Sequence, residues 1–140
     1  MEPTLQDGNN LIVDKLSYRF RDPKRYEIIV FPYKYEENTY YIKRIIGLPG
    51  ETVQVTGGYV YINGELLESD IYGAEPMADG GIASEPITLG ADEYFVLGDN
   101  RNHSSDSRDP SVGILHREDL LGRAWVRIYP FDKIGVIQHE

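Results

Sequence analysis

The sequence predicts a mainly β protein. Eleven of its 140 residues are tyrosine, and valine and isoleucine recur in short runs. Gly, Pro, Asn and Asp separate these runs, which is the composition of strands joined by tight turns. Hydrophobic residues make up 41% of the chain, enough for one domain of this length to bury a core without disulfides or metals.

Seven segments have the length and composition of strands: residues 10–15, 26–31, 40–46, 52–55, 59–62, 93–97 and 123–129. Two turn signals, Thr56-Gly57-Gly58 and Asn63-Gly64, predict two hairpins in succession and hence a β-ribbon. Residues 67–85 are acidic, rich in Gly and Ala and without periodicity, so we expect an exposed loop of variable conformation. The one helical signal is a short turn in HREDLLGR, which we expect to end at Gly122.

Composition narrows the class of function. A net charge of -9 disfavours nucleic acid as a partner, because phosphate recognition needs a basic surface. With no cysteine in the chain, neither disulfides nor thiolate chemistry is available. No run approaches the roughly 18 apolar residues of a membrane span, and the N-terminus lacks a signal-peptide pattern. The abrupt start, MEPTLQDGNN, suggests a piece of a longer protein.

The polar loop LGDNRNHSSDSRDP, residues 97–110, is the unusual region. It can be a solvated turn, but Asp106 and Arg108 are two residues apart, so in an extended segment they share a face and can pair. Such a pair can brace a site. His103 and His116 are candidates for metal ligands or for the base of a serine triad. His116 lies beside a predicted surface turn and His103 has no Cys or carboxylate at ligand spacing, so we expect exposed histidines, no metal and no cofactor. The acidic residues considered as a paired-carboxylate site are expected to form a solvated rim: Asp7, Asp14, Glu36 and Glu37.

Lys43 lies within the strand predicted at residues 40–46. Alternation places Tyr41, Lys43 and Ile45 on one face and Arg44 on the other, so each face carries one cation. Two arrangements of Lys43 are possible. Its side chain can extend along an apolar surface with its ammonium in water, or its neighbours can desolvate the ammonium. In the second case its pKa falls, and the neutral amine can take a proton from a nucleophile.

Four segments together resemble the ordered sequence boxes of bacterial type I signal peptidases: MEPTL, YEIIVFP, YIKRIIGLPGE and GDNRNHSSDSR. They follow the family's order and spacing and leave only about residues 52–92 uninformative. The resemblance implies an antiparallel β-barrel or β-sheet catalytic core with a β-ribbon insertion. Residues 1–51 and 93–140 would form that core, and residues 52–92 the insertion, within one compact unit.

The resemblance implies a membrane-bound serine endopeptidase that uses a Ser-Lys dyad to remove signal peptides from secreted preproteins. It would act on the extracytoplasmic face of the bacterial cytoplasmic membrane. Lys43 matches the general base and Ser104 the serine that orients it. Asp106 and Arg108 match a supporting ion pair, and Gly98 a position where the backbone approaches closely; Arg44 is then the ordinary cation of the strand.

The chain departs from the family at its start. The nucleophilic serine of the family immediately precedes the methionine that corresponds to Met1, and the family's oxyanion-hole serine and membrane anchor lie further upstream. Because Lys43 and Ser104 are both present, we interpret this as a truncation rather than a loss of function. We expect residues 1–140 alone not to cleave.

The resemblance also implies two shallow apolar pockets for a signal peptide bound as an extended strand, which suits small-x-small cleavage sites. The first pocket would receive the substrate residue just before the cleaved bond, and its residues would be Met1, Leu5, Tyr41, Ile42, Val96 and Leu97. The second would receive the substrate residue two positions earlier, and its residues would be Leu11, Val30 and the shared Ile42. Leu11 and Val30 can equally be core residues.

Three other interpretations remain open. Self-cleaving repressors and mitochondrial inner-membrane peptidases share the fold and dyad, but in general not the long box at residues 98–108. A catalytically silent relative, acting as an assembly factor or peptide-binding module, tends to replace the lysine. A β adaptor domain without an active site is the third.

Overall fold

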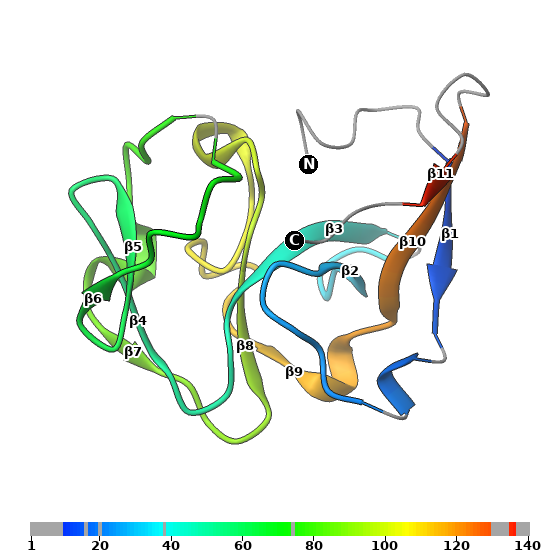
Figure 1. Cartoon of the computed structure of the whole chain (residues 1–140), viewed down its shortest axis with the longest axis horizontal. Helices are drawn as coiled ribbons and strands as arrows, with labels where there is room; N and C mark the ends of the chain where they lie inside the picture. The colour runs from blue at the N-terminus through cyan, green and yellow to red at the C-terminus, as the bar shows by residue number, and fades with distance from the viewer. Residues whose placement is uncertain are drawn as a thin grey trace.

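The computed structural model describes residues 10–15, 17–19, 21–37, 39–73, 75–129 and 135–136, and these form two antiparallel β-sheets with short 3-10 turns between some of their strands. Figure 1 shows the smaller sheet on one side, the β1, β10 and β11 strands on the other, and β3 and β8 between them. The mainly β fold predicted from composition is therefore confirmed.

The larger sheet has seven strands in the order β1-β10-β2-β3-β8-β9, with β11 paired to β10. Its strands are β1 (Asn10–Asp14), β2 (Ile28–Pro32), β3 (Tyr40–Gly47), β8 (Glu93–Leu97), β9 (Leu115–His116), β10 (Gly122–Tyr129) and β11 (Gly135–Val136). The prediction began β2 at Tyr26, which is too early. Tyr26 has a φ of 73°, a left-handed conformation that cannot continue a strand.

The smaller sheet, in the order β6-β5-β4-β7, contains the predicted ribbon. Its strands are β4 (Thr52–Thr56), β5 (Tyr59–Ile62), β6 (Glu65–Leu66) and β7 (Ile87–Thr88). Asn63 and Gly64 at the second turn have φ values of 53° and 84°. Two successive positive φ angles define the type I′ turn that this dipeptide favours, so the hairpin prediction is confirmed.

Apolar clusters cover both faces of β3. On one face, Ile46 packs with residues of β8 and of the smaller sheet, so this cluster joins the two sheets. On the other face, Ile45 packs with residues of β2, β8 and β9. Lys43 and Arg44 therefore stand on opposite faces of a strand that is buried on both sides.

The prediction for residues 67–85 is wrong in one respect. The backbone is irregular and many side chains are exposed, as expected, but Met77 and Ala83 are buried in the cluster that joins the two sheets. One turn here, η2 (Gly81–Ser84), is a 3-10 helix. The segment therefore packs against the apolar cluster between the two sheets.

The predicted helical turn is a 3-10 helix, η4 (Arg117–Asp119), but Gly122 does not end it. Gly122 is the first residue of β10 and pairs with Val30 of β2, so the sheet and not a helix cap determines its backbone. Two further 3-10 turns are η1 (Ser17–Arg19) and η3 (Arg101–His103). Within the described ranges, every helix is too short and too polar to cross a bilayer.

Candidate active site

Lys43 and Ser104 meet although 61 residues separate them. Lys43 lies in the middle of β3, and Ser104 follows η3 in the loop after β8. The Lys43 Nζ donates a hydrogen bond to Ser104 Oγ at 2.8 Å. Because β3 and β8 are neighbouring strands, the loop after β8 returns directly over the lysine.

The Lys43 side chain is half-buried. Its Nζ lies 5.5 Å from the centre of the Tyr41 ring, on the same face of the strand. Burial lowers the pKa of the Lys43 ammonium; the carboxylates of Asp106 and Asp99 oppose the shift and the Arg108 guanidinium adds to it. Burial therefore shifts Lys43 toward the neutral amine, which is the form that can accept a proton.

Gly98 forms the floor beneath this pair. A Cβ atom at Gly98 would lie 2.1 Å from Ser104 Oγ and 3.5 Å from Lys43 Nζ. The Gly98 N–H donates to Asp106 Oδ2 at 3.1 Å. Only glycine leaves room for Ser104 to reach the lysine.

Asp106 and Arg108 form the ion pair predicted from their spacing. Arg108 Nη2 and Nε donate to the two carboxylate oxygens of Asp106 at 2.8 and 2.9 Å, and both residues are buried. Arg108 also donates to the backbone carbonyls of Arg101 and Asp79. Each side-chain nitrogen of Arg108 and each carboxylate oxygen of Asp106 therefore has a hydrogen-bond partner. These bonds fix the loop that carries Ser104.

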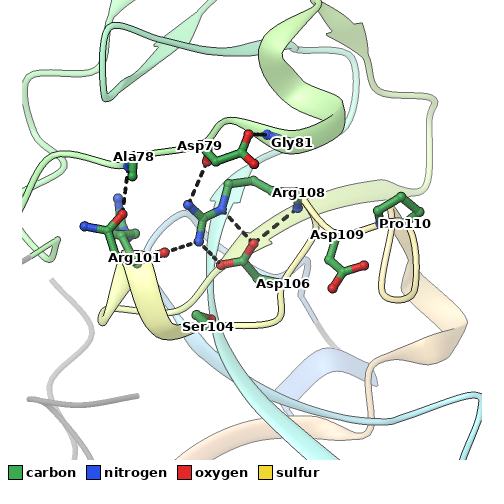
Figure 2. Close-up of a pocket in the computed structure, with 10 residues that line it drawn as sticks. Ala78, Asp79, Gly81, Arg101, Ser104, Asp106, Arg108, Asp109 and Pro110 are labelled. Atoms are coloured by element: carbon green, nitrogen blue, oxygen red, sulfur yellow. Dashed lines mark hydrogen bonds and ion pairs between the residues drawn. The ribbon is translucent and has the colours of Figure 1, made fainter.

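A pocket of about 340 Å³ opens beside Ser104. Figure 2 shows its polar wall, in which Arg108 links Asp106 to Asp79 and to Arg101, with Ser104 next to Asp106. The lining residues come from two segments: Ala78, Asp79, Gly81, Arg101, Asn102, Ser104, Asp106, Arg108, Asp109 and Pro110. Of the residues predicted to bind substrate, the described ones are not among them: Val30, Tyr41, Ile42, Val96 and Leu97.

Comparison with known proteins identifies the family. A family model described as "Signal peptidase, peptidase S26" matches residues 1–129. The chain belongs to this family. It is 46% identical to a probable signal peptidase I-2 of Synechocystis sp., over 100% of this chain and 64% of that protein. It is also 46% identical to a signal peptidase I of Leptolyngbya laminosa, over 96% of this chain and 67% of that protein.

A solved structure, a signal peptidase I from Enterococcus faecalis, is 34% identical and superposes with a TM-score of 0.60, covering 74% of this chain and 97% of that chain. The fold predicted from the resemblance to signal peptidases is therefore confirmed. The chain spans about two thirds of the length of the curated cyanobacterial relatives.

The structure places part of the substrate-binding set predicted for this peptidase S26 chain. Val30 lies opposite Ile42 in the β2–β3 register, so these two side chains share a face. Leu97 lies opposite Arg44 and therefore on that same face, away from Lys43. The remaining two lie on the Lys43 face, in or against one cluster: Tyr41 and Val96.

The other predicted substrate contacts, Met1 and Leu5, lie outside the described residues, and of Leu11 only its strand is described. The resemblance to signal peptidases predicts that six residues line one pocket, whereas those of the six that the structure describes lie on two different faces of the sheet. The substrate set stays a prediction.

Arg44 is not the ordinary cation that the sequence suggested. It is 1% exposed and donates to both carboxylate oxygens of Asp99, at 2.9 and 2.8 Å. Its guanidinium carbon lies 3.8 Å from the centre of the Tyr72 ring. A cation on a strand face that a second sheet buries needs a carboxylate. The sequence did contain a candidate partner for Arg44, namely Asp99 in the segment GDNR.

His103 and His116 are exposed, as expected. His116 lies 3.4 Å from an Asp92 oxygen and 3.9 Å from a Glu93 oxygen. Across the described parts of the chain, no three His, Asp or Glu side chains gather in a way that would hold a metal ion. Asp14, one of the rim carboxylates, pairs with Arg123 at 2.8 Å.

Proposed function

We propose that this chain carries the general-base side of a signal peptidase I, a serine endopeptidase that removes N-terminal signal peptides from secreted preproteins. One observation supports this most directly: the half-buried Lys43 Nζ, with a lowered pKa, lies 2.8 Å from Ser104 Oγ. A silent peptide-binding relative would have no use for a lysine held in this state.

In the proposed reaction, neutral Lys43 removes the proton from a serine hydroxyl as the oxygen attacks the scissile carbonyl. The resulting ammonium gives that proton to the leaving amine, and an acyl-enzyme forms. Neutral Lys43 then activates the water that hydrolyses it. The lysine thus needs a pKa low enough to be neutral at the start of each half-reaction.

Ser104 would orient the base. A neutral amine has two N–H bonds and one lone pair, and Lys43 uses one N–H to donate to Ser104 Oγ. This bond restricts rotation of the amine, so its lone pair can be directed at the nucleophile. The Asp106–Arg108 pair and Gly98 would hold Ser104 in place without touching the substrate.

The nucleophile follows from the family resemblance, which places it immediately before Met1. The peptide would bind as an added strand, with small side chains at the two positions that face the protein. By the same resemblance, an N-terminal anchor would hold the catalytic part at the extracytoplasmic face of the cytoplasmic membrane. Residues 52–92 would be an insertion in that catalytic part.

The test uses three polypeptides and a peptide substrate with a small-x-small site. They are residues 1–140, the same chain with a serine placed before Met1, and that serine chain with Lys43→Ala. Mass spectrometry should find the cleaved bond only with the second. Turnover by residues 1–140 that Lys43→Ala abolishes would contradict the placement of the nucleophile.

Lys34 provides the matched control. Its Nζ lies 5.2 Å from the centre of the Tyr35 ring, a contact like that between Lys43 and Tyr41, but it is exposed on the surface. Lys34→Ala in the serine chain should leave cleavage unchanged. Equal losses from Lys34→Ala and Lys43→Ala would refute a specific role for Lys43.

A further inference from the structure

The backbone of Gly98, beneath Lys43 and Ser104, is held on both sides of its Cα atom. Its N–H donates to Asp106, which pairs with Arg108. Its carbonyl accepts a hydrogen bond from Arg101 Nε at 2.8 Å. Arg101 directly, and Arg108 through Asp106, therefore determine where the Gly98 backbone lies, and only Arg108 belongs to the pair that the sequence singled out.

Arg101 has its own carboxylate. Its Nη1 and Nη2 donate to the two oxygens of Asp70 at 2.7 and 2.8 Å, and Arg101 is 3% exposed. With one nitrogen on Gly98 and two on Asp70, the guanidinium is fixed as a rigid link between them. Gly73 packs against it, since a Cβ there would lie 3.2 Å from Arg101 Cγ.

The segment that contains Asp70 is bound to the same loop at further points. Asn102 accepts a hydrogen bond from the Ala78 N–H at 2.7 Å and donates to the Pro76 carbonyl at 3.1 Å. The Ile82 N–H donates to the Arg108 carbonyl at 3.0 Å. Figure 2 shows the links from Ala78 and Asp79 to this loop. Residues 70–73 and 75–82 thus form a support along the loop at residues 98–108.

We propose that Asp70 is a positioning residue of the active site, acting through Arg101 on Gly98 and so on the contact between Ser104 and Lys43. This role rests on the proposed function of Lys43 and extends it to the middle segment of the chain. The support would keep the floor of the site closed, so that the lysine remains desolvated.

The effect of Asp70 on Lys43 is geometric. The charges that shift the pKa of Lys43 are those of Asp106, Arg108 and Asp99, and Asp70 is not one of them. If the Asp70–Arg101 link weakens, the Gly98 carbonyl loses its fixed donor and water can reach the lysine. The pKa of Lys43 should then rise toward the ordinary lysine value, because its burial is the main cause of the lowering.

The experiment measures the titration midpoint of Lys43 by NMR, in residues 1–140 and without substrate. Asp70→Asn keeps the shape of the side chain but removes its charge, and it should raise the midpoint by about one pH unit, a tenfold change in the neutral fraction at a given pH. Asp70→Glu, which keeps the charge, should restore most of the difference. In the serine chain, the acid limb of the cleavage profile should move by the same amount.

Glu51→Gln is the matched control. Glu51 pairs with both Nη atoms of Arg25 at 2.8 and 2.6 Å, and Arg25 also donates to the Ile46 carbonyl. The pair has the same chemistry without contact to Gly98. Glu51→Gln should lower the melting temperature and leave the Lys43 midpoint unchanged.

An Asp70→Asn variant that loses stability as the control does, with no movement of the Lys43 midpoint, overturns the proposal. If the serine chain fails to cleave, the proposed function fails, while the titration still decides the role of Asp70.

Discussion

The substitution Gly98→Ala tests the geometry of the site most directly. The added Cβ would lie 2.1 Å from Ser104 Oγ and 2.7 Å from Ser104 Cβ. Non-bonded heavy atoms need about 3.5 Å, so Ser104 Oγ must retreat by about 1.4 Å. Such a movement takes the 2.8 Å hydrogen bond from Lys43 beyond its useful range.

The cost follows from two terms. Overpacking of a tight site costs about 1–3 kcal/mol, and loss of the Lys43–Ser104 hydrogen bond adds about 1 kcal/mol. We therefore expect Gly98→Ala to lower the unfolding free energy in urea by about 2–4 kcal/mol. In the serine chain it should reduce kcat far more than it changes KM, because Lys43, the proposed base, loses its orientation.

Gly50→Ala separates strain from crowding. Gly50 has a φ of 82° and no atom within 4 Å of the position of a Cβ, so alanine there costs about 1–2 kcal/mol in backbone strain alone and should leave cleavage unaffected. Wild-type stability and kcat in Gly98→Ala would show that the loop has room for Ser104 to move, and that the reasoning is wrong.

Three further predictions follow from charges and contacts at the site. The pKa of Lys43 is lower in the folded than in the unfolded chain, so the unfolded chain binds the extra proton between the two values. The unfolding free energy should thus rise with pH up to about 10.4. Lys43→Met should remove this dependence on pH and stabilise the protein at neutral pH. Urea titrations at several pH values test this, and an unchanged dependence of the unfolding free energy on pH in Lys43→Met contradicts it. Asp99→Asn leaves Arg44 buried without its carboxylate and should cost about 3–5 kcal/mol in the same assay; a loss below about 1 kcal/mol would show that other contacts suffice. Ser104→Ala should cost only about 1 kcal/mol of stability, for the lost hydrogen bond from Lys43, and reduce kcat of the serine chain at least about 100-fold; an unchanged kcat would exclude an orienting role.

The longer strands could be predicted because alternation and turn dipeptides are properties of neighbouring residues in the sequence. Alternation placed Lys43 and Arg44 on opposite faces, and the Asn63-Gly64 dipeptide gave the type I′ turn. The short strands β6, β7, β9 and β11 span two residues each, too few for a periodic signal. They form because neighbouring strands offer unpaired backbone groups.

The contacts of Asp70 could not be predicted in the same way. Asp70 lies 31 residues from Arg101, in a segment without periodicity or strand signals. Nothing local distinguishes it from the other acidic residues there, several of which remain exposed. A buried arginine requires a carboxylate, but which one it finds depends on how the two sheets pack.

Lys43 and Arg44 show how two adjacent cations can be buried in one strand with different results. A guanidinium cannot release its proton in a protein, so Arg44 must be paired, and Asp99 and Tyr72 surround it. An ammonium can lose its proton, so burial of Lys43 can be relieved by a lower pKa in place of an ion pair. In the loop after β8, the Asp106 carboxylate is bound to Arg108, and Lys43 donates a hydrogen bond to the hydroxyl of Ser104. Arg44 and Arg108 thus occupy the carboxylates of Asp99 and Asp106, which fits the proposed role of Lys43 as a base.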